Sequence, residues 1–370
     1  MQDEAFDRER GLRSLTVALG PRRAILAARL LHVGAVLALA GFAAAVPAGA
    51  GAQSWSPRPG VTRAPIEIRV TPLPAFDPRE SGRTRFGELA WRGGFEMTSE
   101  RKEFGGLSAL RVAADGQRFV AVSDKGHWIA GRIVHQGKRP VGVADVEIAP
   151  VLGPDGKAIQ TRGWYDTEAM AADGGTLYLG LERVHRILRF DFGRHGLAAR
   201  GQPIAVPPGF KSLRSNKGIE ALVAVPKGHP HAGALIAISE ASLDDAGNIR
   251  AFLIGRGGGE FAVKRSDDFD VSDAALTPRG DLLLLERRYS LWRGVAARIR
   301  RIALAQVAPG AILDGPVIFE ADMGFQIDNM EGLSVHRDAD GETVLTLVSD
   351  DNYSMLQRSI LLQFTLVEPE

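Results

Sequence analysis

Residues 329–336 read Asn-Met-Glu-Gly-Leu-Ser-Val-His and lead through Asp340-Gly341 into residues 344–352, Val-Leu-Thr-Leu-Val-Ser-Asp-Asp-Asn. Apolar and β-branched runs on either side of an Asp-Gly pair are typical of two antiparallel strands joined by a tight turn. This stretch therefore predicts a β-hairpin whose second strand ends in acidic residues.

The same arrangement occurs four more times upstream, so the chain contains five copies of one unit. A polar or acidic residue lies near the start of each first strand, at Ser108, Glu168, Glu220, Asp273 and Glu331. A second acidic position lies at the end of each second strand, at Asp124, Glu182, Glu240, Glu286 and Asp350. The first set is spaced by 60, 52, 53 and 58 residues, which is about the size of one propeller blade.

Further strand-like segments follow each copy, and together they predict an all-β, six-bladed β-propeller that forms a single domain over residues 65–370. The apolar run 360–366 is expected to pair with N-terminal strands of an incomplete first blade, which removes the exposed sheet edges. Residues 88–97 contain Gly93-Gly94 and are expected to form a hairpin.

The N-terminal residues 1–52 have the features of an export signal: a basic segment around Arg22-Arg23, an apolar run from Val33 to Val46, and small residues at Ala50-Gly51-Ala52. The apolar run is shorter than the roughly 20 residues that span a membrane, so no stable membrane insertion is expected. We expect cleavage near Ala52, a flexible lead-in over residues 53–64, and a periplasmic or secreted mature protein.

The composition excludes several classes of function. The chain has no cysteine, which rules out disulfides and thiolate metal sites. Removal of residues 1–52 leaves 39 Lys and Arg against 40 Asp and Glu, and this balance does not favour nucleic-acid binding. There is also no Gly-x-Ser-x-Gly elbow, phosphate loop or His-Glu-x-x-His motif. We expect a monomer that acts on a small ligand.

The recurring acids are the candidate site, because rotation about a propeller axis brings equivalent positions together. Carboxylates in a narrow channel repel one another unless some are protonated, bind a cation or pair with Lys and Arg. Oxygen ligands without cysteine favour Ca²⁺, and less strongly Mg²⁺. The candidate metal ligands are Glu168, Glu220, Asp273, Glu331, Asp350 and Asp351.

Basic residues follow the second acidic position, and a guanidinium beside carboxylates could hold an anionic ester. The candidate catalytic residues are therefore Glu168, Glu220 and Glu331, together with Arg183 and Arg287. The alternative is structural: the acids accept hydrogen bonds from turns, and the basic residues form ion pairs between blades.

Several motifs occur in order along the mature chain, among them Ser123-Asp124-Lys125-Gly126, Asn216-Lys217-Gly218-Ile219-Glu220-Ala221 and Asn329-Met330-Glu331-Gly332-Leu333. In these motifs the chain resembles the phytase-like family known as "esterase-like activity of phytase". The resemblance implies an exported bacterial β-propeller and hydrolysis of phosphate or other esters. It assigns no catalytic role to any one residue.

Three functions fit these observations. The leading hypothesis is a hydrolase that cleaves phosphate or other esters with the help of a divalent cation in the propeller channel. The second is a metal-dependent sugar-lactone hydrolase, and the third is a periplasmic binding or scaffold propeller without turnover. Carboxylate oxygens that meet at one point favour an enzyme with a cation, whereas acids engaged in turns favour a scaffold.

Overall fold

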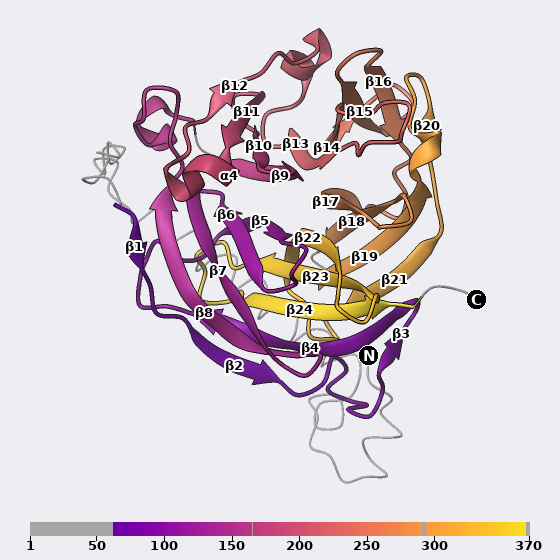
Figure 1. Ribbon diagram of the computed structural model, residues 1–370. Helices are drawn as coiled ribbons and strands as arrows, with labels where there is room; N and C mark the ends of the chain where they lie inside the picture. The colour runs from indigo at the N-terminus through magenta and orange to yellow at the C-terminus, as the bar shows by residue number, and fades with distance from the viewer. Residues whose placement is uncertain (1–61, 165, 291–293, 368–370) are drawn as a thin grey trace, which may run out of the picture. The chain divides into compact units, whose positions relative to one another are not determined.

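The computed structural model describes residues 62–164, 166–290 and 294–367. Within these residues the strands form five sheets, arranged around an axis like the blades of a propeller (Figure 1). The innermost strands contact one another in a closed ring and are β5 (Leu107–Val112), β9 (Thr167–Asp173), β13 (Ile219–Ala224), β17 (Asp270–Leu276) and β22 (Asn329–Arg337). The predicted all-β propeller is confirmed.

The other strands extend each blade outward from its inner strand. Blade 1 adds β6 (Arg118–Ser123), β7 (His127–Gln136), β8 (Arg139–Pro150) and β1 (Ala64–Pro65). Blade 2 adds β10 (Thr176–Leu181), β11 (Arg186–Asp191) and β12 (Gln202–Pro203). Blade 3 adds β14 (Leu235–Leu243), β15 (Ile249–Ile254), β16 (Gly259–Val263) and β20 (Ile312–Leu313). Blade 4 adds β18 (Asp281–Ser290), β19 (Gly294–Ala303) and β21 (Val317–Asp322).

Blade 5 corrects the predicted count of six blades. It contains β22, β23 (Thr343–Asp350) and β24 (Ser359–Leu366), and it is completed by β4 (Leu89–Thr98), β3 (Arg85–Phe86) and β2 (Arg69–Leu73). The C-terminal strand does pair with an N-terminal strand, antiparallel from Ser359 opposite Met97 to Leu366 opposite Leu89. The N-terminal strands thus complete the blade of the fifth repeat and do not form a sixth.

The glycine pair in β4 makes a bulge where a hairpin was predicted. Gln363 lies opposite Gly93 and Phe364 lies opposite Trp91, so Arg92 is the extra residue. Gly93 has φ 152°, a backbone conformation that residues other than glycine rarely adopt. The strand therefore continues through residues 89–98 and spans the whole edge of β24.

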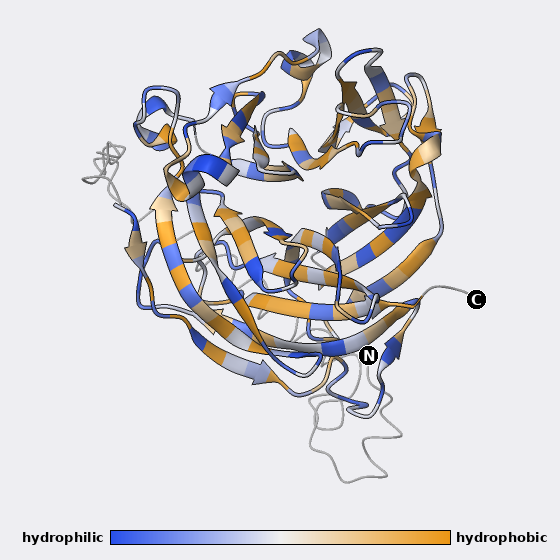
Figure 2. Ribbon diagram, in the orientation of Figure 1, coloured by the Kyte–Doolittle hydropathy of each residue, from blue (hydrophilic) through white to orange (hydrophobic). Residues whose placement is uncertain are grey.

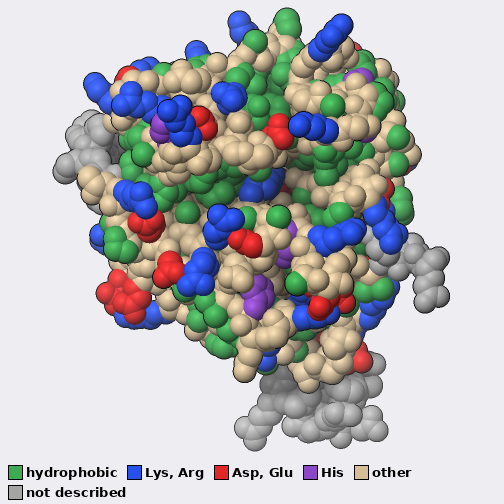
Figure 3. All heavy atoms as spheres, in the orientation of Figure 1, with side chains coloured by type: hydrophobic (Ala, Val, Ile, Leu, Met, Phe, Trp, Pro, Cys, Tyr) green, Lys and Arg blue, Asp and Glu red, His purple; other side chains and the backbone are tan. Residues whose placement is uncertain are grey.

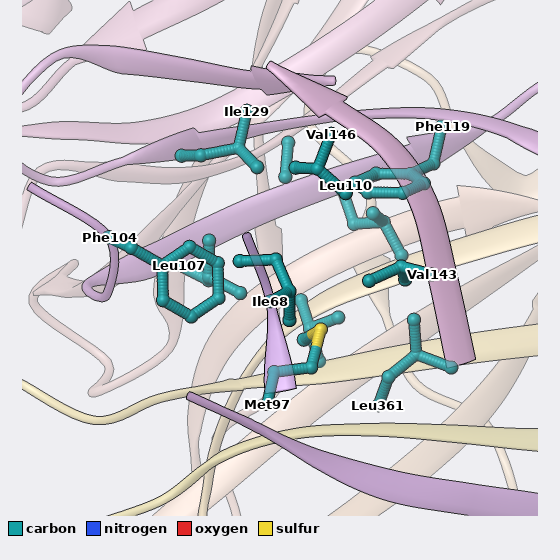
Figure 4. A pocket seen from close by; sticks show the side chains of 12 residues that line it. Ile68, Met97, Phe104, Leu107, Leu110, Phe119, Ile129, Val143, Val146 and Leu361 are labelled. Carbon is teal, nitrogen blue, oxygen red and sulfur yellow. The ribbon is translucent and has the colours of Figure 1, made fainter. Parts of the chain in front are cut away.

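The apolar residues form five clusters, each between two neighbouring blades. Alternation of apolar and polar residues along the outer strands is visible in Figure 2. Between blades 5 and 1, Met97 and Leu361 face Leu110 and Ile129 around a cavity of only about 10 Å³ (Figure 4). Such dense packing seals each blade against its neighbours and supports a long chain as one domain.

The predicted export signal and most of the lead-in over 53–64 lie outside the described residues. Among the residues that are described, no helix is long and apolar enough to cross a membrane. On the face shown in Figure 3, acidic and basic side chains are interspersed, with hydrophobic side chains between them.

Candidate functional site

Every inner strand carries a β-bulge at its second or third residue, and the bulged residues form one ring around the axis. In β22, Met330 lies opposite Ser349 and Gly332 opposite Val348, which leaves Glu331 as the extra residue. The same one-residue shift in register identifies the bulged residue of each other inner strand. The ring therefore consists of Ser108, Glu168, Glu220, Ser272 and Glu331. A bulge re-aims the side chain of its extra residue, and here it does so in all five blades.

Blade 4 departs from the predicted alignment by one residue. Its bulged residue is Ser272, so Asp273 does not occupy the position of Glu220 and Glu331. The end of its second strand is shifted in the same way, because Arg287 pairs with Asp270 just as Asp350 pairs with Asn329. The second ring is therefore Asp124, Glu182, Glu240, Arg287 and Asp350, and the fourth blade supplies a cation.

Arg287 is bonded to acids of both rings. Its guanidinium lies 2.5 Å from Glu331 Oε1 and donates to Glu240 Oε1 at 3.0 Å. It also donates to Asn329 Oδ1 at 2.6 Å, and the Asn329 amide in turn donates to Glu331 Oε1 at 2.9 Å. Lys217 lies 2.7 Å from the other oxygen of Glu240. One face of the cluster is thus neutralised by ion pairs.

The acids of the two rings outnumber these cations, and several of them hold their protons more tightly than usual. Burial raises the pKa of Glu331 to about 8 against the opposing effect of Arg287, and Asp350 and Glu240 add to the rise. Burial, followed by repulsion from Glu168 and Glu331, raises the pKa of Glu220 well above its ordinary value. Glu168, Glu220 and Glu331 thus lie close enough to repel one another when they are ionised.

Four further acids of the two rings have a pKa shifted in the same direction. Glu168 keeps some surface open to the channel, yet desolvation by the protein around it, followed by repulsion from Glu331, raises its pKa well above the ordinary value. Burial raises the pKa of Glu182 to about 7 and that of Asp350 to about 7. Burial raises the pKa of Asp124 to about 6, while the adjacent Lys125 opposes the rise. Near neutral pH the cluster is therefore poised between protonated and ionised states.

Two observations show that the cluster has the donor set for a cation. Carboxylate oxygens of Glu182, Glu220 and Glu240 all lie within 4.8 Å of one another. Glu331 is only 4% exposed, and its Oε2 is buried without a hydrogen-bond partner. Oxygens at these separations can share one Ca²⁺ at typical ligand distances of about 2.3–2.6 Å.

Asp273 is engaged deeper in the channel, where it bonds to Arg111. Its two oxygens accept from the Arg111 guanidinium at 2.8 and 3.1 Å, and Oδ2 also accepts from the Leu333 amide at 2.8 Å. The guanidinium donates in addition to one carbonyl of every inner strand: Leu110, Met170, Leu222, Ala274 and Leu333. Each of these carbonyls lies two residues beyond the bulged residue, roughly 7 Å further along its strand.

Two further predicted residues have local partners. Asp351 accepts from the amides of Gly106 and Tyr353 and from the Ser359 hydroxyl, at 2.9, 3.0 and 3.0 Å. Arg183 is half exposed and lies 2.6 Å from Asp166. Of the predicted residues, the structure thus brings together Glu168, Glu220, Glu331, Asp350 and Arg287. The other three, Asp273, Asp351 and Arg183, bond to partners outside this cluster.

Glu286 belongs to a separate, fully buried network behind the ring. It accepts from Arg298 at 2.6 Å and from Arg300 at 2.9 and 2.5 Å. Because adjacent residues of a strand point to opposite sides, fixing Glu286 inside the blade directs Arg287 toward the axis. Arg298 and Arg300 of β19 therefore position the one cation of the second ring.

A five-bladed propeller with buried carboxylates around one end of its axis is the class of protein that the fold and the site define. The chain belongs to the phytase-like family, because the model of that family, described as "Esterase-like activity of phytase", matches residues 102–353. A search of curated proteins gave no match.

Several solved structures are similar at low identity. A glutaminyl cyclase of Myxococcus xanthus has 10% identity and a TM-score of 0.38, over 84% of this chain and 100% of that chain. A PQQ-bound aldose sugar dehydrogenase of Streptomyces coelicolor has 13% identity and a TM-score of 0.36, over 82% and 99%. An α-L-arabinanase of Cellvibrio cellulosa in complex with arabinohexaose has 11% identity and a TM-score of 0.39, over 70% and 91%. No residue role is transferred from them.

Proposed function

We propose that this protein is an exported hydrolase of phosphate or other esters that works with a divalent cation bound in the carboxylate cluster. The observation that carries the proposal is the unpartnered, buried Oε2 of Glu331 beside Arg287, together with the carboxylate oxygens of Glu182, Glu220 and Glu240 that lie within 4.8 Å of one another. Membership of the phytase-like family supports ester hydrolysis. The signal-like residues 1–52 support export to the periplasm or beyond the cell.

Ca²⁺ is the cation we propose, ahead of Mg²⁺. Ca²⁺ accepts an irregular set of six to eight oxygens, whereas Mg²⁺ requires near-octahedral geometry and keeps several waters. Glu182, Glu220 and Glu240 would hold the ion, with Glu168 and Glu331 close enough to perturb Glu220 electrostatically and Asp350 close enough to perturb Glu331. A bound divalent cation would supply Lewis acidity toward an ester oxygen.

The residues of this chain have separate roles in the proposed reaction. Arg287 binds and orients the negative charge of the ester, because its fork of N–H groups suits phosphate and carboxylate oxygens. Glu331 is the proposed general base: its pKa of about 8 in the metal-free protein suits proton transfer near neutral pH. Lys217 holds Glu240 in place through their 2.7 Å ion pair.

A scaffold without turnover is the alternative that a specific observation favours, because part of the predicted site does have structural roles. Asp351 bonds two backbone amides and Asp273 is neutralised by Arg111. In a scaffold, every acid of the cluster would be held by a structural hydrogen bond or ion pair of this kind. The two candidates therefore differ in what the remaining acids do.

Calcium titration of the folded protein tests the proposal. Ca²⁺ should raise the thermal midpoint, because a ligand that binds only the folded state adds about 2.7 kcal/mol at 100 times its dissociation constant. Glu220→Gln and Glu331→Gln should each abolish this rise and the hydrolysis of phosphate and carboxylate esters, with little loss of metal-free stability.

The matched control is Glu320→Gln, which changes an exposed acid of β21 and should retain both properties. If wild-type protein shows no calcium response, and the two substitutions in the cluster each cost several kcal/mol, the acids are structural and the scaffold function is the better one.

A further inference from the structure

A groove of about 1050 Å³ extends from the carboxylate cluster over the ends of blades 4 and 5. Glu240, Arg287 and Asn329 line both the groove and the cluster, so the two are continuous. The groove is larger than the space that an ester group alone requires, which means that a bound ester has room for a bulky substituent.

The outer part of the groove presents apolar side chains to solvent. Tyr289 is 73% exposed, Met323 59% and Leu356 93%, and the half-buried Val295 lies with them along the groove. Of the seven large hydrophobic side chains that are exposed in the described chain, these three line the groove and Met355 adjoins it in sequence. Apolar surface concentrated at one place next to a polar centre marks a binding surface.

The charges of the groove argue against a highly charged ligand. Its described lining contains four basic and four acidic residues, and most of the basic ones already have an acidic partner. Arg265 lies 2.7 Å from Asp270, and Lys217 lies 2.7 Å from Glu240. The inner end opens onto the cluster, where the seven acids of the two rings outnumber the charges of Arg287, Lys217 and one divalent cation together, so a polyanion would meet net repulsion there.

We propose that the groove binds an apolar or aromatic alcohol group of the substrate, while a single anionic or acyl group of the ester lies at Arg287. This substrate class rests on the hydrolase function proposed above, but binding in the groove does not require turnover. Densely phosphorylated polyols are the substrates that this arrangement disfavours. Tyr289 and Leu356 are the specificity-determining residues.

Binding is tested with two stable probes, 1-naphthylphosphonate and methylphosphonate, by calorimetry on the full mature protein with Ca²⁺ present. The naphthyl probe should bind at least 10-fold more tightly, because it buries aromatic surface that the methyl probe lacks. The double variant Tyr289→Ser/Leu356→Ser should reduce this ratio to near 1. Ile312→Ser, which removes a 62% exposed side chain on β20, should leave the ratio unchanged.

Hydrolysis separates this inference from the function on which it rests. The value of kcat/KM should be at least 10-fold higher for 2-(1-naphthyl)ethyl phosphate or acetate than for ethyl phosphate or acetate, whose leaving alcohols have similar acidity, and lowest for inositol hexakisphosphate. A naphthyl preference in binding without turnover of any ester would support the groove and refute the hydrolase. Turnover with no naphthyl preference, unaffected by the double variant, would refute the groove and retain the hydrolase.

Discussion

At the scale of single residues, Arg287 is the position on which the electrostatics of the site depend. It is the basic member of a ring that is otherwise acidic, and it contacts Glu331 and Glu240. Its removal would leave two largely buried carboxylates without their main counter-charge, and such a loss costs several kcal/mol.

Arg287→Gln should therefore lower the free energy of unfolding by about 3 kcal/mol, as measured by urea denaturation in chelator. The matched control is Arg132→Gln, which removes an exposed arginine paired with Asp145 and should cost less than about 1 kcal/mol. Equal costs for the two substitutions would show that Arg287 does not stabilise the cluster.

Sequence reasoning identified the acids of the site but misplaced one repeat. In blade 4, Asp273 follows the bulged residue Ser272, and Glu286 precedes Arg287, which pairs with Asp270. An alignment that matches acid to acid therefore places this repeat one residue out of register. The bulge, which is a property of the paired backbone, decides the register. Repeat analysis also missed Arg111, because it occurs in one copy only. The feature that could have identified Arg111 is its position as a basic residue between Leu110 and Val112, two buried apolar residues of an inner strand.

At the scale of elements, β24 holds the two ends of the described chain together. Phe364 on this strand lies at ring-centroid distances of 5.1 Å from Phe76, 5.1 Å from Trp91 and 5.5 Å from Phe319. These partners come from the N-terminal segment and from blade 4. One side chain thus joins blade 5 to both the start of the chain and the neighbouring sheet.

Phe364→Ala should lower the free energy of unfolding by about 3–5 kcal/mol, because it removes a fully buried ring and leaves a cavity. Chemical denaturation checks this value. Val317→Ala, at a side chain that is 45% exposed, is the control and should change stability by less than about 0.5 kcal/mol. A small effect at Phe364 would mean that closure through β24 contributes little.

The sequence predicted that the terminal strands pair, but it could not predict the number of blades. A strand pattern shows which segments are extended, and it does not show whether two N-terminal strands begin a new sheet or complete the last one. The Gly93-Gly94 pair has the same ambiguity, since glycine favours both a turn and a bulge. In both cases the partner strand, β24, determines the outcome.

At the scale of the whole molecule, the cluster predicts how stability depends on pH. The folded protein holds protons on Glu331, Glu182 and Asp350, whose pKa values of about 8, 7 and 7 lie above those of an unfolded chain. Between pH 6.5 and 8 the folded state therefore binds more protons than the unfolded state, and stability falls as pH rises.

The histidines act in the opposite direction at lower pH. Burial lowers the pKa of His127 and His336 to about 4, so between about pH 4 and 6.5 these two residues bind more protons in the unfolded state and partly offset the carboxyl groups. The carboxyl groups with raised pKa outnumber the two histidines, so in chelator the thermal midpoint should fall from pH 5 to 8, most steeply above pH 6.5. The loss from pH 6.5 to 8 should be on the order of 2 kcal/mol.

Ca²⁺ should reduce this alkaline loss, and Glu331→Gln should reduce it in chelator, because each removes a proton-linked repulsion. Differential scanning calorimetry across pH 5–8 provides the measurement. A midpoint that rises steadily to pH 8 in chelator would show that the acids are fully ionised and paired in the folded state.

Arg111 has a consequence for the ancestry of the fold. In many repeat proteins each repeat contacts only its neighbours, so one more copy can join the array without disturbing distant repeats. Here a single guanidinium already donates to carbonyls of all five inner strands and to Asp273. A sixth copy would widen the ring and draw some of those carbonyls out of its reach, and the loss of one copy would crowd the rest. Arg111, at the centre of the ring of inner strands, therefore makes duplication or loss of a blade unfavourable. We expect this lineage to diversify through its loops.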